Sequence, residues 1–507
     1  MLDLGASFLA SVSRDPHALA VVDGDIRLTY AQWYRKISAL VAGFDRLGLK
    51  AGDHVLTLMM NRWENASLHW ACQFAGLIVT PLNWRAKSDE VEYALQDADA
   101  KAVFFEEITS EAVASAPSAA GLPAISAADL QAMMEADAPD VRPRANADDW
   151  SLMLYTSGTT SRPKGVPRRH RAERAGAVAH VAQNLYRHGE RTLGVMPLYH
   201  TMGVRSLIAS SLIGGTFVCL PRFNAARAIE LIESESITNL YLVPTLYHDV
   251  IHDPAFSPER VKTVTKLGFA GASMTDGLLK RLDAAFRPEL FVNHYGSSEI
   301  YTFTIEQDAV SKPGSAGRAG INQIIRVVKL GANSPDELAE IGEEGEIIAA
   351  LIGDEAFEGY WKRPDADAKA LRDGWYFTGD TGFYDQEGDL FVTGRVDDMI
   401  ITGGENVSPV EVESCLSLHD QVAEVAVVGL PDERWGKIVT AFVKRKGEVS
   451  AEELDDHCRR SGLANFRRPR RIVFVDEIPK SPVGKILRRK LVAGEYSPEG
   501  AIASQEN

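Results

Sequence analysis

The stretch LYTSGTTSRPKGVP, residues 154–167, follows a short apolar run and predicts a strand that ends in a phosphate-binding loop. It places five hydroxyl side chains, at 156, 157, 159, 160 and 161, before a lysine at 164. Backbone amides, hydroxyls and a lysine ammonium can together surround a polyphosphate. The stretch is not a P-loop of the nucleotide triphosphatases, because Lys164 precedes Gly165 instead of following a glycine.

The composition indicates a globular protein of more than one domain. The chain has 507 residues, 45% of them hydrophobic and 24% charged, and a formal net charge of −16. This negative charge argues against nucleic acid as a partner. The four cysteines lie far apart without metal-ligand spacing, which predicts neither a zinc site nor disulfides and favours the reducing cytoplasm. Residues 203–220 predict a buried helix leading into a strand, so we expect no membrane insertion.

Apolar runs and amphipathic stretches alternate over most of the chain, which predicts layered α/β sheets in a large N-terminal domain. Residues 341–393 predict a small antiparallel β unit, and a compact α/β domain follows a boundary near 394–398. The stretch 459–490 holds eleven Lys and Arg against two acidic residues, and predicts either a solvated face or a site for a phosphorylated ligand. The charged run RRHRAER (168–174) predicts only a solvated helix start.

Seven motifs in order resemble those of the adenylate-forming superfamily, which includes acyl- and aryl-CoA ligases, luciferases and peptide-synthetase adenylation domains. Within it, the chain is most similar to the 4-chlorobenzoate–CoA ligase type. The motifs are YTSGTTSRPKG (155–165), MPLYH (196–200), GFAGAS (268–273), HYGSSE (294–299), GWYFTGD (374–380), GRVDDMIITGGENVSPVEVE (394–413) and PKSPVGKILRR (479–489). The resemblance covers nearly the whole chain.

The resemblance implies a first step in which a carboxylate attacks the α-phosphate of ATP and pyrophosphate leaves. Positive charge and Mg²⁺ must stabilise this transfer between anions. The residues implied for the β- and γ-phosphates are Thr156, Ser157, Gly158, Thr159, Thr160 and Lys164. Those implied for the adenosine and the α-phosphate are Gly271, Ala272, Ser273, Tyr295, Gly296, Ser298, Asp380 and Arg395. Glu299 is implied as the Mg²⁺ ligand and Lys485 as the catalytic bridge between carboxylate and α-phosphate.

The resemblance also implies a second step, in which a thiol takes the acyl group after the C-terminal domain rotates. We therefore expect domains at 1–395 and 399–507, with a hinge at 396–398 centred on Asp397. Gly403 and Gly404 would let a pantetheine arm pass close to the backbone. The other residues implied for coenzyme A are Trp435, Arg85, Arg468 and Arg470. A carrier-protein thiol is the alternative acceptor.

The resemblance places the acid in a pocket that His200 closes. The other implied lining residues are Val178, Thr201, Met202, Tyr241, Ala272, His294, Tyr301 and Thr302. Because buried polar groups need partners, the polar members favour an aromatic acid with a hydroxyl or another polar substituent. A short dicarboxylic acid or a fatty acid is the alternative. We expect Arg205 to form a salt bridge elsewhere; if it faces the pocket, a second anionic group on the substrate follows.

These features predict an enzyme, an AMP-forming carboxylate–CoA ligase that uses ATP, Mg²⁺ and coenzyme A. Its partners are these small molecules, and a homodimer is left open. A non-catalytic nucleotide-binding relative is the rival interpretation. The presence of Lys485, Asp380 and Glu299 argues against it.

Overall fold

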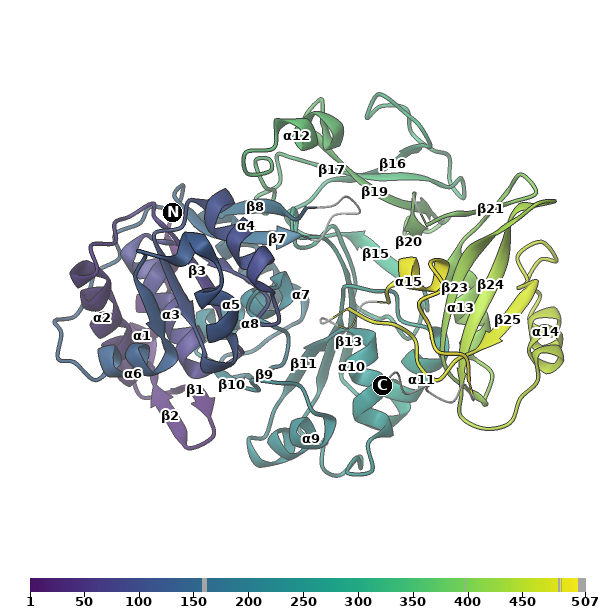
Figure 1. The fold of residues 1–507 in the computed structure, drawn as a ribbon. Helices are drawn as coiled ribbons and strands as arrows, with labels where there is room; N and C mark the ends of the chain where they lie inside the picture. Colours follow the sequence, from purple (N-terminus) through teal and green to yellow (C-terminus); the bar gives the residue numbers. More distant parts are fainter. Residues whose placement is uncertain (157–161, 397, 482–483, 485, 500–507) are drawn as a thin grey trace, which may run out of the picture.

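The computed structural model describes residues 1–156, 162–396, 398–481, 484 and 486–499. Three sheets organise this part of the chain (Figure 1). Two sheets and their helices form the large N-terminal part, and the third lies at the opposite side of Figure 1 in the C-terminal domain. The predicted α/β architecture of two unequal parts is confirmed.

The first sheet has six strands in the order β6-β5-β3-β4-β7-β8, parallel except for the final pair. Its strands are β3 (His54–Leu58), β4 (Ile78–Pro81), β5 (Ala102–Phe105), β6 (Ala124–Ser126), β7 (Trp150–Thr156) and β8 (Lys164–Arg169). The helices of this region are α1 (Leu4–Arg14), α2 (Tyr30–Arg46), α3 (Trp63–Ala75), α4 (Ser88–Ala98), α5 (Ser110–Ala114) and α6 (Ala127–Met134). Helix α3 contacts strands of both N-terminal sheets and is buried along its whole length, which makes it part of the core.

The second sheet has fourteen strands, parallel through its centre and antiparallel toward both ends. They are β1 (Leu19–Asp23), β2 (Ile26–Thr29), β9 (Arg191–Gly194), β10 (Thr216–Cys219), β11 (Asn239–Leu242), β12 (Lys266–Phe269), β13 (Leu290–Tyr295), β14 (Thr304–Glu306), β15 (Ser315–Ala319), β16 (Ile325–Lys329), β17 (Gly345–Ala350), β18 (Leu371–Arg372), β19 (Trp375–Tyr384) and β20 (Leu390–Arg395). Its helices are α7 (His170–Gln183), α8 (Thr201–Leu212), α9 (Ala225–Ser234), α10 (Pro244–His252), α11 (Asp276–Phe286) and α12 (Pro364–Ala370). The predicted antiparallel unit joins this sheet where β20 pairs with β15.

The helix and strand predicted over 203–220 are α8 and β10. Both elements are buried, as their apolar residues predicted. In the part of the chain that the structure describes, no helix is long and apolar enough to cross a membrane.

The C-terminal domain carries a separate five-stranded sheet. Its elements are β21 (Ile400–Thr402), β22 (Glu405–Val407), β23 (Val422–Asp432), β24 (Gly436–Arg445), β25 (Arg471–Phe474), α13 (Pro409–Ser417), α14 (Ala451–Arg460) and α15 (Arg488–Val492). The chain passes from the N-terminal sheet to this one between residues 395 and 400. Asp397 lies outside the described residues, so its hinge role stays a prediction.

Several contacts dock the C-terminal domain on the N-terminal part, and two of them involve α10 and α11. The Thr245 hydroxyl donates a hydrogen bond of 2.9 Å to the Gly484 carbonyl, in the loop that contains Lys485. The backbone N–H of Gly277 at the start of α11 donates to the Ser417 hydroxyl at 3.4 Å. A Cβ at Gly277 would lie 2.3 Å from the Ser417 carbonyl oxygen, so this close approach of α11 and α13 requires glycine.

The charged run at 168–174 differs from its prediction as a solvated helix start. Arg168 and Glu173 are fully buried and form a salt bridge of 2.8 Å. Arg168 Nη1 also donates to the carbonyl oxygens of Glu299 and Glu355, each at 2.7 Å. A buried arginine is stable when its donors and its charge are both satisfied, as they largely are here.

Candidate active site

The phosphate-binding loop leaves β7 and returns in β8. Thr156 and Lys164 are paired across these two strands, and the Thr156 hydroxyl lies 3.5 Å from the Lys164 carbonyl oxygen. The antiparallel pair therefore brings the two ends of the loop together. Ser157, Gly158, Thr159 and Thr160 lie outside the described residues, and their phosphate contacts stay predictions.

Lys164 lies beside a tyrosine that holds the predicted metal ligand. Its Nζ is 3.9 Å from the centre of the Tyr360 ring, and the Tyr360 hydroxyl donates to Glu299 Oε1 at 2.6 Å. Burial lowers the pKa of Lys164, an effect that the nearby Glu299 carboxylate opposes. A cation and a buried carboxylate thus share one end of the site, as binding a metal–polyphosphate complex requires. Tyr360 was not predicted from the sequence.

Three predicted adenosine residues form a connected group at the carboxyl end of β13. Asp380 forms a salt bridge of 2.8 Å with Arg395 and accepts a hydrogen bond of 2.6 Å from the Tyr295 hydroxyl. Asp380 and Arg395 are direct partners in the β19–β20 register, so the sheet itself aligns them. Burial, together with the Asp380 charge, holds the pKa of Tyr295 well above its ordinary value, so the phenol stays protonated and donates.

The remaining nucleotide residues lie on turns that follow parallel strands. Gly271 has φ +82° directly after β12, and Ala272 and Ser273 continue this turn. Gly296 and Ser298 follow β13 in the same way. Carboxyl ends of parallel strands lie at one edge of a sheet, which is where open α/β sheets bind ligands.

Gly296 lies so close to the next segment that a side chain cannot fit. A Cβ there would lie 2.1 Å from the Tyr301 carbonyl oxygen. We therefore expect Gly296→Ala to lower the free energy of unfolding by about 2–3 kcal/mol and to weaken ATP binding. Urea unfolding and calorimetric titration with ATP measure both effects.

The control for Gly296 is Gly189→Ala, in a loop where the added Cβ meets nothing within 4 Å but φ is +82°. This change costs about 1–2 kcal/mol through backbone strain alone and leaves ATP binding unchanged. Equal ATP affinities in wild type and Gly296→Ala would contradict the proposed role of the turn.

Four of the predicted pocket residues gather around Arg205: Tyr241, His294, Tyr301 and Thr302. His200 caps the start of α8, where its Nδ1 accepts from the Met202 N–H at 3.3 Å. Thr201 and Met202 begin the same helix and are buried. Helix α8 thus carries the predicted pocket-closing histidine and Arg205 on neighbouring turns.

Val178 is 41% exposed and lies on the opposite side of α7 from the buried His180, which belongs to the cluster and was not predicted. The pocket contact of Val178 therefore stays a prediction. The expectation for Arg205 is wrong. Arg205 forms no salt bridge within the described residues. Its guanidinium instead donates to Thr302 Oγ1 at 2.7 Å and to the Tyr241 hydroxyl.

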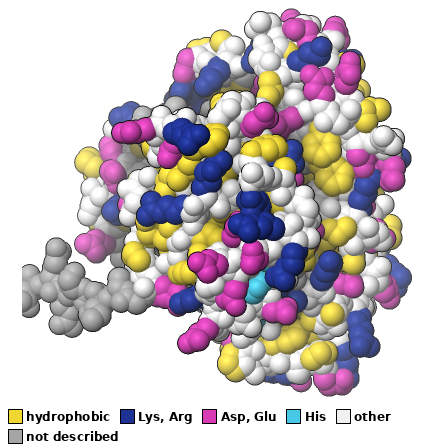
Figure 2. All heavy atoms as spheres, turned by 90° about the vertical axis from the view of Figure 1, so that its right-hand side faces the viewer, with side chains coloured by type: hydrophobic (Ala, Val, Ile, Leu, Met, Phe, Trp, Pro, Cys, Tyr) yellow, Lys and Arg dark blue, Asp and Glu magenta, His cyan; other side chains and the backbone are white. Residues whose placement is uncertain are grey.

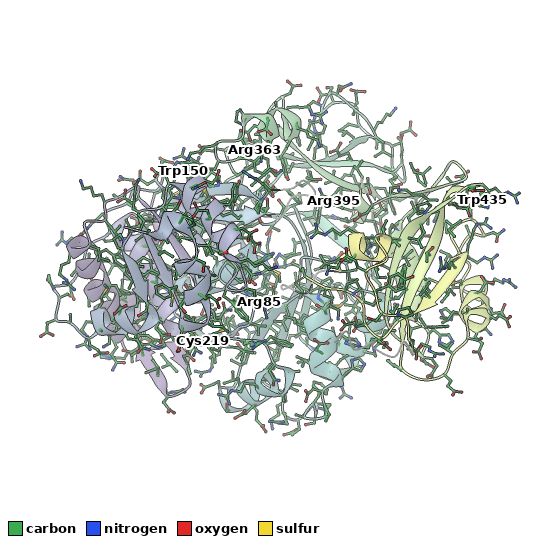
Figure 3. The ribbon with its side chains drawn as sticks, viewed as in Figure 1. Arg85, Trp150, Cys219, Arg363, Arg395 and Trp435 are labelled. Carbon is green, nitrogen blue, oxygen red and sulfur yellow. The ribbon has the colours of Figure 1, made fainter. Side chains whose placement is uncertain are left out.

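The predicted coenzyme A residues fall into two separate groups in this arrangement. Gly403, Trp435 and Arg470 lie together: a Cβ at Gly403 would lie 2.7 Å from the Trp435 ring, and the Arg470 guanidinium lies 4.2 Å from the centre of that ring. Gly403 and Gly404 have φ values of +60° and +90°. Figure 3 shows Trp435 at the outer side of the C-terminal domain and Arg85 near the middle of the molecule.

Arg85 lies close to Tyr199, which directly precedes His200. Burial raises the pKa of Tyr199 to about 12, and the nearby Arg85 charge opposes this rise. Arg85 thus lies near the segment of the predicted pocket-closing histidine, and its coenzyme A contact stays a prediction.

Much of the positive charge of 459–490 is neutralised within the domain. Six of its Lys and Arg form ion pairs: Arg459, Arg467, Arg468, Lys480, Arg488 and Lys490. Arg468, predicted to bind a phosphate of coenzyme A, pairs with Asp455 at 2.9 Å. Figure 2 accordingly shows Lys and Arg interspersed with Asp and Glu on the face of the C-terminal domain. Lys485 lies outside the described residues.

The comparison with known families agrees with this geometry. Residues 8–361 match the AMP-binding enzyme family, and residues 411–485 match the AMP-binding enzyme C-terminal domain. The chain belongs to the AMP-binding enzyme family. The predicted superfamily and the prediction of an enzyme are thereby confirmed.

Relatives of this AMP-binding enzyme align along nearly their whole lengths. The 4-chlorobenzoate–CoA ligase of Arthrobacter sp is 33% identical over 493 residues, which cover 95% of this chain and 93% of the relative. The 2-succinylbenzoate–CoA ligase of Bacillus licheniformis is 32% identical, covering 94% of this chain and 97% of the relative. A solved benzoate CoA ligase from Burkholderia xenovorans LB400 superimposes with a TM-score of 0.88 at 25% identity, covering 97% of this chain and 100% of that one.

Proposed function

We propose that this AMP-binding enzyme joins a compact carboxylic acid of aromatic size to coenzyme A through an acyl adenylate. In the first reaction an oxygen of the acid attacks the α-phosphorus of ATP, and pyrophosphate leaves. In the second, the sulfur of coenzyme A attacks the acyl carbon, the thiol proton passes to solvent, and AMP leaves. The relatives named as ligases of benzoate, 4-chlorobenzoate and 2-succinylbenzoate support an aryl acid.

The observation that carries this proposal is the Asp380 group. Its carboxylate is oriented by Tyr295 and Arg395 at the carboxyl end of β13 and suits the two hydroxyls of a ribose. Lys164 at the start of β8 and Glu299 after β13 both contact Tyr360, and they would supply a cation and a carboxylate for the phosphates and metal of such a nucleotide. The two N-terminal sheets together thus offer groups for sugar, phosphate and cation.

Mg²⁺ fits the donor set at Glu299. This buried carboxylate has one oxygen held by the Tyr360 hydroxyl, which orients the group toward its ligand. Mg²⁺ commonly takes one or two protein carboxylates and fills its remaining positions with water and phosphate oxygens. When bound, it would neutralise charge on the phosphates, while Lys164 supplies a further positive charge from the protein.

We further propose that the observed domain arrangement is the one for adenylation. The Thr245–Gly484 hydrogen bond holds Gly484, which precedes Lys485 in the sequence, against the N-terminal part. Trp435 lies at the outer side of the C-terminal domain, and Arg470 contacts its ring. Transfer to coenzyme A would then need a rotation at 396–398 that brings Gly403 and Gly404 to the site.

The test measures pyrophosphate release with ATP, Mg²⁺ and a panel of carboxylic acids, and acyl-CoA formation after coenzyme A is added. We expect release that depends on the acid, and AMP formation that coenzyme A accelerates. Asp380→Asn should raise KM for ATP about 100-fold, because it removes the negative charge that accepts hydrogen bonds from Arg395 and would accept them from the ribose hydroxyls.

The matched control is Asp45→Asn, a surface partner of Arg144 that lies 2.6 Å from it. It should leave KM for ATP unchanged. AMP release that requires a carrier protein and is not supported by coenzyme A would refute the assignment of the acceptor.

A further inference from the structure

Arg205 is a buried cation whose direct partners are all neutral. It is 2% exposed, and its Nη1 donates to the Tyr301 carbonyl at 3.2 Å and to Thr302 Oγ1 at 2.7 Å. Its Nη2 donates to the Tyr241 hydroxyl, and its Nε has no hydrogen-bond partner within the described residues. Burial raises the pKa of Glu355, and the Arg205 charge opposes this rise; the two side chains nevertheless form no salt bridge.

Two neighbouring histidines leave further polar atoms unused. The His180 and His294 rings are 5.3 Å apart, and both hydrogen-bond with Asn184. His180 Nε2 and His294 Nδ1 are buried, and neither has a partner among the residues that the structure describes. Burial, together with the Arg205 charge, holds the pKa of both imidazoles well below the ordinary value, so both rings are neutral. Each neutral ring keeps one donor and one acceptor.

This cluster adjoins the proposed adenylation residues along the chain. His294 precedes Tyr295, the residue that hydrogen-bonds Asp380, on β13. Thr302 follows Glu299 by three residues, and Arg205 follows the helix-capping His200 by five. An acid whose carboxylate reaches the α-phosphate would therefore extend its remote end toward Arg205.

The electrostatic cost of Arg205 points to the chemistry of that remote end. A buried cation is stabilised best by an anion in direct contact, and charge-assisted hydrogen bonds are about twice as strong as neutral ones. The carbonyl and hydroxyls that accept from Arg205 supply hydrogen bonds but no charge, and the Glu355 carboxylate acts on Arg205 without a salt bridge. A substrate group that is both an acceptor and an anion would supply the missing charge and engage the unused nitrogens.

We propose that the acid is a dicarboxylate: one carboxylate is adenylated, and Arg205 binds the other, aided by His180 and His294. The spacer is short or aromatic, because Tyr241 and the two imidazoles surround the cation closely. This inference rests on the proposed acid–CoA ligation and specifies its substrate class. An acid with an apolar remote end would leave the buried polar groups unpaired and be selected against.

The test compares matched acids in pyrophosphate release: benzoate against the three benzenedicarboxylates, and butanoate against butanedioate and pentanedioate. We expect kcat/KM for at least one diacid to exceed that of its matched monoacid by about 100-fold or more. Arg205→Met should remove this preference, chiefly by raising KM for the diacid, while monoacids react as well as before or better. Arg205→Lys should recover part of the preference, because it restores the charge without the planar fork.

The control is Arg187→Met, an exposed arginine on the surface that should keep the wild-type preference. The proposal is overturned if the wild type prefers every monoacid to its matched diacid. It is also overturned if Arg205→Met lowers kcat/KM equally for the monoacids and the diacids. If Arg205→Met does not fold, the ratio of kcat/KM for the diacid to that for its matched monoacid, measured in the wild type and in Arg205→Lys, tests the proposal. If no acid supports pyrophosphate release, acid–CoA ligation fails as the function, and calorimetric titration of the same diacids into wild type and Arg205→Lys decides whether Arg205 binds a second carboxylate.

Discussion

Lys485→Ala is expected to lower the rate of acyl-adenylate formation by about 10²–10³-fold, the loss typical when one donor to a developing anion is removed. The resemblance of PKSPVGKILRR to the adenylate-forming superfamily assigns Lys485 to the bridge between carboxylate and α-phosphate. The structure adds that the preceding Gly484 carbonyl is held by Thr245 of the N-terminal part. Single-turnover pyrophosphate release measures this first reaction.

Transfer from acyl-AMP to coenzyme A should survive in Lys485→Ala, because the proposed rotation moves the lysine away before the thiol attacks. Synthetic acyl-AMP supplied to the variant isolates this second reaction. Lys490→Ala, an exposed neighbour that pairs with Glu495, is the control and should keep both rates. An equal loss of both reactions in Lys485→Ala would contradict the separation of roles.

Arg168→Met is expected to lower the free energy of unfolding by about 3–5 kcal/mol, because it leaves Glu173 buried without its counter-charge. Arg168 Nε pairs with Glu173 at 2.8 Å, and both side chains are fully buried. The Arg168 guanidinium also lies 4.1 Å from the centre of the Tyr301 ring. Urea unfolding, followed at the transition of the N-terminal part, measures the change.

A second substitution distinguishes the buried charge from lost packing. Arg168→Met combined with Glu173→Gln should recover part of the stability, since no uncompensated charge then remains; the bonds to the Glu299 and Glu355 carbonyls stay lost. The control is Arg171→Met, a partly exposed arginine of the same run that pairs with Asp148 and Glu358. If Arg168→Met has a free energy of unfolding no lower than that of Arg171→Met, the importance of the buried ion pair is contradicted.

The architecture and the nucleotide residues were accessible from the sequence for two different reasons. Alternation of apolar runs and amphipathic stretches reports burial directly, so α8 and β10 and the separate C-terminal domain could be expected. Asp380, Tyr295 and Arg395 were accessible only through motifs, because residues 85 positions apart carry no local signal of contact. Their meeting depends on the β19–β20 register and on the end of β13.

The pocket shows where local reasoning fails. Val178 was predicted to line the pocket, yet it is 41% exposed and lies about 200° around α7 from the buried His180. Tyr360 was missed because it reaches Glu299 from 61 residues away. The run RRHRAER could have suggested more: an arginine and a glutamate five residues apart, across the junction of β8 and α7, can pair once both are covered.

The sequence by itself determined the class of the fold, the order of the motifs and the residue types available for phosphate, ribose and cation, because hydrophobic periodicity and side-chain chemistry are local properties. The tertiary structure decided which charges are buried and with whom they pair. Arg168 forms a salt bridge with Glu173, whereas the hydrogen-bond partners of Arg205 are all neutral, although the sequence places both arginines near the start of a helix. Burial removes water from both, and only the three-dimensional neighbourhood determines whether a counter-charge replaces it.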